Sequence, residues 1–208
     1  MDLYSYVVAY DSGFAPNPFY GSCTLATCKP RIRNTAQIGD WIVGSGSADK
    51  SKKQGSLLVY AMKISEILTF DEYFGDVRFQ QKKPLLIGSR KQARGDNIYH
   101  QVNGKWIQLN SYHSNANGVA NMDHVTRDTR INRVLISEYY CYFGKDGPML
   151  PDINGRDGRH ICHHGRNHSK FSASNELDKS LIDDFVEWFD DLGELGFMSP
   201  PYDWRDAQ

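Results

Sequence analysis

Histidine and cysteine are concentrated in one short segment late in the chain. Imidazole and thiolate are the groups that zinc prefers, and they also act as acids or bases near neutral pH. Glycine and asparagine within the segment argue against a helix, and no Cys-x-x-Cys pair occurs elsewhere in the chain. No cofactor is therefore predicted, and zinc is kept as an alternative. The residues that could hold it are His160, Cys162, His164 and His168.

An ordered polar loop explains the same segment without a metal, since imidazoles can hydrogen-bond to backbone groups. Another interpretation makes it a loop that contacts phosphate or base through its histidines and Arg166. His113 lies in a different polar run, where it could act as a general acid or base. Whether the chain is an enzyme is left open. The candidates for catalysis are His113, Cys162, His163 and His164.

An aromatic loop near the N-terminus offers a second kind of chemistry. Two prolines and two glycines exclude regular structure from residues 11–21. Flat rings beside an amide can hold a free or flipped base through stacking and edge hydrogen bonds. An aromatic plug that closes one end of the core explains the same composition equally well. The candidate base-binding residues are Phe14, Asn17, Phe19 and Tyr20.

Three cations, Lys29, Arg31 and Arg33, follow this loop and lie close in sequence to two thiols, Cys23 and Cys28. Neighbouring cations favour a reactive thiolate. A cysteine nucleophile also needs a nearby base, however, and the sequence does not show that a histidine approaches. The three cations are therefore preferred as phosphate contacts over either cysteine as a nucleophile, and solvated surface charges are the alternative.

The most basic window runs from residue 78 to residue 94 and contains six cations and no acidic residue. Pro84, Gly88 and Ser89 predict irregular structure there. Clustered cations in a loop suit contacts with phosphate, although they are also common on solvated surfaces. The candidates taken from this window are Arg90, Lys91 and Arg94.

The elements that must position these residues are mostly short strands. Thr69 and Glu72 fit a helix capping box, and Asn103-Gly104 between two alternating runs predicts a hairpin. Because no strand–helix–strand alternation appears, we expect an α+β fold with a mixed or mainly antiparallel sheet, and the pattern allows a small barrel. Strands are predicted at residues 4–10, 41–46, 57–65, 97–100, 105–109 and 132–143, short helices at 30–36 and 69–74, and loops at 111–122 and 145–174.

Apolar residues recur at helical spacing near the C-terminus. They predict one amphipathic helix at residues 176–192 with an acidic outer face, followed by an extended tail at 197–208. Residues 1–174 carry 22 basic and 15 acidic side chains, and residues 175–208 carry 2 and 10. A basic body suits a phosphate-facing surface, but an acidic helix packed beside a basic face would explain the same asymmetry.

The chain has 208 residues, of which 40% are hydrophobic. That length suits one core, and a single domain at 1–208 is predicted. No apolar stretch approaches the ~20 residues of a membrane span, and the N-terminus lacks the pattern of a signal peptide. We therefore expect a cytoplasmic protein with no membrane partner. Four cysteines in a chain of this length indicate free thiols rather than a disulfide scaffold.

Five motifs stand in a distinctive order, at residues 14–19, 23–33, 39–46, 95–100 and 133–137. In this order they resemble the second family of nucleotide modification associated domains, over nearly the whole chain up to residues 160–164. The resemblance implies an α+β domain linked to systems that modify DNA bases, and it transfers no catalytic residue. The turn at Gly39-Asp40 and the strands after it are also similar, over a short stretch, to base-recognising domains of the pseudouridine-synthase-and-archaeosine-transglycosylase (PUA) type.

Together these features favour a protein that binds a modified nucleobase or nucleotide. The expected partner is a nucleotide or a nucleic acid, with DNA favoured over RNA. One alternative is an enzyme that acts on a base or nucleotide through the His/Cys segment. A further alternative is a protein that sequesters a small nucleotide. Binding that weakens steeply with salt would indicate a polymer, and tight binding to a mononucleotide would indicate sequestration.

Overall fold

The computed structural model describes residues 1–48, 54–162, 165 and 167–204. These residues form two compact units. The first consists of residues 1–11 and 36–65 with the chain from residue 138 onward, and the second consists of residues 12–35 and 66–137. The single domain expected from the sequence stays a prediction. Of the helices in the described ranges, none has the length and apolar character that a bilayer crossing requires.

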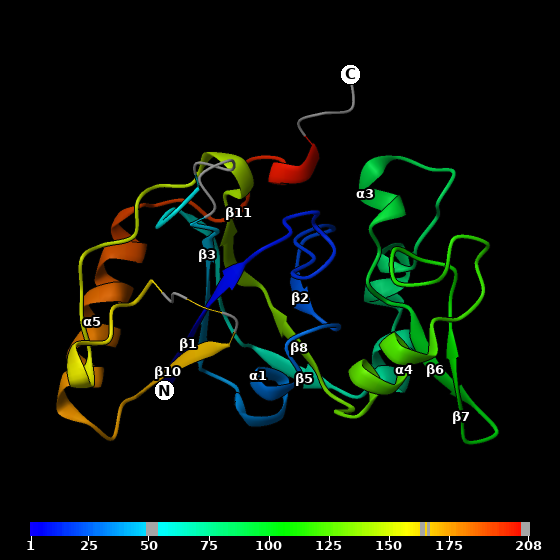
Figure 1. The fold of residues 1–208 in the computed structure, drawn as a ribbon, viewed down its shortest axis with the longest axis horizontal. Coiled ribbons are helices and arrows are strands. Elements are labelled where there is room, and N and C mark those ends of the chain that lie inside the picture. Colours follow the sequence, from blue (N-terminus) through cyan, green and yellow to red (C-terminus); the bar gives the residue numbers. More distant parts are fainter. Residues whose placement is uncertain (49–53, 163–164, 166, 205–208) are drawn as a thin grey trace. The chain divides into compact units, whose positions relative to one another are not determined.

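A six-stranded mixed sheet forms the centre of the first unit (Figure 1). Its strand order is β10-β1-β3-β4-β9-β11, so it is open, with β10 and β11 at its edges. Two pairs, β1–β3 and β9–β11, are parallel, and the others are antiparallel. The strands are β1 (Asp2–Val8), β3 (Trp41–Gly46), β4 (Leu58–Lys63), β9 (Tyr139–Tyr142), β10 (His168–Ser172) and β11 (Gly196–Phe197).

The long helix α5 (Glu176–Asp191) covers one face of this sheet (Figure 1). Its apolar face places Phe185 and Phe189 against Trp41, with ring centroids 5.5 and 4.9 Å apart, respectively. Burial of such rings is the main stabilising contribution of an amphipathic helix. The helix predicted at residues 176–192 is thus confirmed. Three 3₁₀ helices complete the regular structure described in this unit, at Gly144–Asp146, Arg156–Gly158 and Tyr202–Trp204.

The second unit contains a three-stranded antiparallel sheet and a two-stranded hairpin. The sheet has the order β2-β8-β5, and the hairpin turns at Asn103 and Gly104, which both have positive φ as the predicted turn requires. The strands are β2 (Cys23–Leu25), β5 (Glu66–Leu68), β6 (Tyr99–Val102), β7 (Lys105–Gln108) and β8 (Val134–Ser137). The helices are α1 (Pro30–Thr35), α2 (Phe70–Gly75), α3 (Arg90–Ala93), α4 (Met122–Thr129) and a 3₁₀ helix at Val77–Lys82.

The expected α+β class is confirmed, but several local predictions are wrong. Residues 78–94 were predicted to be irregular, yet they include most of the 3₁₀ helix at Val77–Lys82 and all of α3. The sheets are open over the described residues, so no closed barrel forms. The strand predicted at residues 132–143 is two strands, β8 and β9, which belong to different sheets and break at Glu138. The loop predicted at residues 145–174 contains the edge strand β10. For residues 132–143, the apolar pattern identified buried strand residues but not the strands with which they pair.

A buried lysine fixes the aromatic loop to the rest of the second unit. Lys82 is fully buried, and its ammonium group donates to the backbone and side-chain oxygens of Asn17 at 3.1 and 2.8 Å. It also donates to the carbonyl of Ser22 at 3.0 Å and to the hydroxyl of Thr24 at 3.2 Å. Thr24 in turn donates to the buried carboxylate of Asp96 at 2.6 Å. Burial lowers the pKa of Lys82 to about 8.

Replacing Lys82 by Met should lower the free energy of unfolding by about 3 kcal/mol, because several buried oxygens lose their donor. Urea unfolding of the full chain measures this loss. The matched control is Lys105→Met, at an exposed lysine of the same unit, where we expect a change of no more than about 0.5 kcal/mol. Equal stability of the two variants would show that the Lys82 network does not hold the loop.

Candidate functional site

The aromatic loop places its rings in two different environments. Phe14 and Phe19 are only 2% exposed, and Phe14 belongs to the core of the second unit. Asn17 is fully buried. Its side-chain oxygen accepts from Lys82, and its side-chain nitrogen donates to the carbonyls of Gly13 and Arg94. Tyr20, by contrast, is partly exposed and lines a pocket. Of the four residues predicted to bind a base, Tyr20 is thus the one at an opening.

That pocket has a volume of about 430 Å³ and lies beside α3. Two lysines, Lys83 and Lys91, line it together with Tyr20. The hydroxyl of Tyr20 is buried and has no hydrogen-bond partner among the described residues, and burial raises its pKa. A ring, several amides and two cations therefore share one opening. The remaining lining residues are Gln80, Gln81, Leu85, Ser89 and Gln92.

The other predicted phosphate contacts are distributed differently. Arg31 and Arg90 are exposed. Arg33 is fully buried, and its guanidinium donates to the carbonyls of residues 28, 128, 131 and 133, so it serves the fold. Arg94 is half-buried, with its guanidinium carbon 4.1 Å from the centroid of the Tyr112 ring. Its Nε is buried without a hydrogen-bond partner in the described part of the chain.

The structure brings a thiol, an imidazole and a carboxylate together in the second unit. Cys28 follows β2, His113 lies in the loop after β7, and Asp128 belongs to α4. The Sγ of Cys28 lies 3.9 Å from Nε2 of His113, and Nδ1 of His113 lies 3.1 Å from Oδ2 of Asp128. The ring of Phe14 packs on His113 with centroids 4.5 Å apart. A histidine thus lies between a thiol and a buried carboxylate.

The turn that carries the thiol is strained and tightly held. Cys28 and Lys29 both have positive φ, at 59° and 39°, which is rare for residues with a Cβ. The backbone N–H of Cys28 donates to Oδ1 of Asp128 at 3.1 Å, and its carbonyl accepts from Arg33 at 3.0 Å. Such conformations persist where the surroundings fix them, and they occur often at functional sites.

Asp128 governs the electrostatics of this cluster. Burial alone would raise its pKa, but hydrogen bonds and charges from His113 and Arg127 hold that pKa well below its usual range. The hydroxyl of Tyr99 also donates to it, at 3.2 Å. Burial disfavours the charged form of His113, yet its hydrogen bonds to Asp128 and Cys28 raise its pKa above 6.5. Burial and the charge of His113 lower the pKa of the adjacent His124.

The His/Cys segment lies in the first unit and is described only in part. Nδ1 of His160 accepts from the backbone N–H of Cys162 at 2.9 Å, and its Nε2 lies 3.3 Å from Asp152. Cys162 is buried in the core of that unit, and His168 begins β10. His163, His164 and Arg166 lie outside the described residues. Within the described ranges, no cluster of potential metal ligands is found. The zinc alternative includes His164 and stays a prediction.

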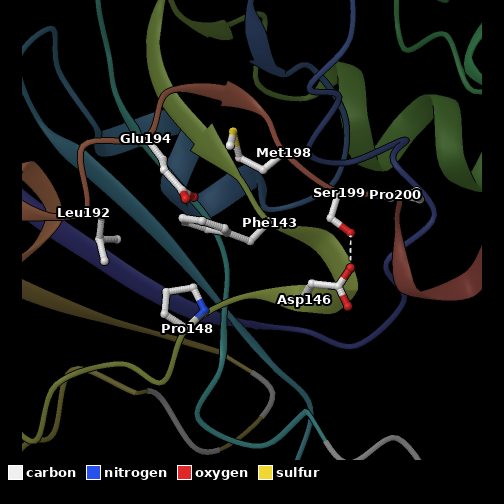
Figure 2. Close-up of a pocket in the computed structure, with 8 residues that line it drawn as sticks. All are labelled: Phe143, Asp146, Pro148, Leu192, Glu194, Met198, Ser199 and Pro200. Carbon is white, nitrogen blue, oxygen red and sulfur yellow. Dashed lines mark hydrogen bonds between the residues drawn. The ribbon is translucent and has the colours of Figure 1, made fainter.

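A second pocket, of about 600 Å³, lies in the first unit and is lined by acidic side chains rather than by lysines (Figure 2). Figure 2 shows the carboxylates of Glu194 and Asp146 among apolar side chains that include Phe143 and Met198. Asp146 accepts from Ser199 at 2.5 Å and pairs with Lys145. The two acidic residues of this second pocket disfavour a phosphate. The pocket beside α3, which is lined by lysines, is therefore the better candidate for a nucleotide.

Comparison with known proteins gives one positive result. A family model, nucleotide modification associated domain 2, matches residues 1–208. The chain therefore belongs to this family, as the motifs in the sequence indicate, and membership associates it with nucleotide modification. No curated protein and no solved structure matches the chain significantly. The choice of ligand and the roles of individual residues consequently rest on the geometry described above.

The His113–Asp128 contact predicts a specific pH response. The pKa of His113 in the folded protein lies above 6.5. Protonated His113 therefore contributes fully to the free energy of unfolding below about pH 6.5, and this contribution is lost as the pH rises through the folded pKa. NMR titration should show this raised value, and Asp128→Asn should bring it below 6.5, because burial then dominates. His100, whose pKa burial lowers, provides an internal control that should not move. An unchanged His113 titration in the variant would contradict the contact.

Proposed function

We propose that this member of the nucleotide modification associated domain 2 family binds a nucleobase or nucleotide in the pocket beside α3. The observation that carries the proposal is the meeting of Tyr20 with Lys83 and Lys91 around one opening of about 430 Å³. A volume of this size lies in the range of small-molecule sites. Family membership supports a ligand of the nucleotide class.

Each type of lining group suits one part of a nucleotide. The ring of Tyr20, which lines the pocket, can offer a face for stacking. The amide of Gln81 can read the edge of a base, since an amide both donates and accepts. Lys83 and Lys91 can neutralise phosphate. Burial lowers the pKa of Lys83, whose ammonium lies 3.6 Å from the centroid of the Phe74 ring, so a phosphate would relieve an incompletely solvated charge.

The residues predicted from the sequence divide between this pocket and its support. Tyr20 and Lys91 line it, and Arg90 is exposed on the same helix, α3. Phe19 lies beneath Lys91, whose ammonium is 5.8 Å from its ring centroid. Asn17 has the supporting role, because its amide ties the aromatic loop to the carbonyl of Arg94 at the end of α3. The loop and the helix that frame the pocket are therefore held together by the buried Asn17.

Reversal of two charges tests this proposal. The double variant Lys83→Glu/Lys91→Glu should weaken binding of a single-stranded DNA oligonucleotide, or of deoxynucleoside monophosphates, by about 10-fold or more, which is about 1.4 kcal/mol. Fluorescence anisotropy for the oligonucleotide and calorimetry for the monophosphates measure this change. A steep dependence on salt would identify the polymer as the ligand, and a weak one would identify the monomer.

Two matched controls distinguish a specific role of the pocket residues from a general effect of net charge or of losing an aromatic ring. Lys63→Glu/Lys105→Glu makes the same change in net charge at two exposed lysines of β4 and β7, and it should leave affinity within about 2-fold. Tyr20→Leu should cost about 1–3 kcal/mol of stacking, whereas Tyr10→Leu, at a ring that is 78% exposed, should cost none. Equal losses in the test and control variants, or no binding of any of these probes, would overturn the assignment.

A further inference from the structure

The contact between Cys28 and His113 indicates a chemical activity that binding of a base would not require. A thiol near an imidazole nitrogen, with the other nitrogen held by a carboxylate, is the arrangement that activates a cysteine nucleophile. The carboxylate of Asp128 accepts from Nδ1–H of His113, which fixes the tautomer and turns Nε2 toward the thiol. The 3.9 Å between Sγ and Nε2 is long for a hydrogen bond, as is common before a substrate binds.

Exposure distinguishes Cys28 from the other cysteines. Cys23, Cys141 and Cys162 are buried, and burial raises the pKa of Cys23 and of Cys141. Cys28 is partly exposed on its left-handed turn, unlike the other three. A buried thiol in an apolar core is inert, whereas an accessible thiol among cations and a histidine is reactive. Position and surroundings therefore both favour Cys28 for chemistry.

Three cations lie near the turn that carries Cys28. Burial lowers the pKa of Lys29 and of Arg33, and charge on Cys28 opposes that shift in both. Arg127, whose side chain is 42% exposed, also lies within range of that charge, and its contact with Asp128 raises its pKa. A cation near a thiol favours its thiolate form.

We propose that Cys28 is the nucleophile of an acyl-transfer centre, with His113 as its acid and base and Asp128 as the residue that positions His113. The substrate class is an acyl compound with an amine, alcohol or thiol leaving group. This centre goes beyond the proposed nucleotide binding and does not depend on it. An acyl carbon is favoured because a histidine beside the sulfur can deliver a proton to the departing heteroatom.

The reaction balances without a further reagent except water. The proton of the Cys28 thiol passes to Nε2 of His113, and the sulfur attacks the acyl carbon to form a carbon–sulfur bond. His113 gives that proton to the leaving group as its bond to the acyl carbon breaks. Water then loses a proton to His113 and attacks the thioester. The carbon–sulfur bond breaks, the acid is released, and His113 returns its proton to the sulfur.

Alkylation of the full chain with iodoacetamide, followed by peptide mapping, gives the first test. Cys28 should react at least about 10-fold faster at neutral pH than the three buried cysteines. His113→Gln should slow it by about 10-fold, and His100→Gln, at a half-buried histidine of the same unit, should leave it unchanged. Alkylation of Cys28 no faster than that of the buried cysteines would overturn the proposal, and this result needs no variant.

The pH profile of the same reaction separates positioning from folding. The groups that face the sulfur and His113 come from four places: Lys29 just before α1, Arg33 on α1, Tyr99 on β6, and His124, Arg127 and Asp128 on α4. Asp128→Asn should move the midpoint of the rate profile to lower pH, since His113 then holds its proton less strongly and is available as the free base at lower pH. A variant that keeps its circular dichroism and shows an unshifted profile would remove Asp128 from this role.

Acylation by p-nitrophenyl acetate tests the reaction itself. Wild-type protein should release a burst of roughly one equivalent of nitrophenol and carry an acetyl group on Cys28, detected by mass spectrometry. Cys28→Ser and His113→Gln should each lose at least about 90% of the burst rate, a 10-fold reduction. Rapid alkylation of Cys28 without an acetyl adduct would refute acyl transfer, even though the thiol is reactive.

Discussion

The buried carboxylate of Asp128 is the interaction on which the chemistry of the second unit depends. It accepts from the backbone of Cys28, from His113 and Tyr99, and from Arg127, and so joins the turn after β2, the loop after β7 and strand β6 to α4. A buried charge is tolerated when its hydrogen-bonding capacity is filled. Here the filled carboxylate both stabilises the unit and fixes the imidazole beside the thiol.

The second unit contains two buried hydrogen-bond networks, and each one fixes a different loop. The Lys82 network holds the aromatic loop and leaves Tyr20 at the opening beside α3. The Asp128 network holds the turn that presents Cys28. A nucleotide-binding protein needs the first of these, and an enzyme of nucleotide modification would use both. Membership in the family supports the nucleotide class, and the geometry supplies the reason to test for catalysis as well.

Local patterns predicted local structure well. The capping box at Thr69, the turn at Asn103-Gly104 and the C-terminal helix are confirmed, because each depends on residues close in sequence. Pairing was not predictable: residues 132–143 divide between two sheets. The site shows the same limit. His113 was identified by its chemistry, but Cys28 and Asp128 lie 85 and 15 residues from it, and no spacing rule joins them. Likewise, Arg33 was predicted to contact phosphate, and Lys82 belongs to the basic window to which the same role was given, yet both side chains are buried.

The most direct test of a functional Cys28–His113 pair is a double-mutant cycle on the rate of acylation. Two groups that act as a unit give strongly non-additive losses, because removing either one disables the other. We therefore expect Cys28→Ser, His113→Gln and the double variant to retain the same residual rate, within about 3-fold. Losses that multiply in the double variant would show that the two side chains act independently, and the thiol and imidazole would then be neighbours without a shared function.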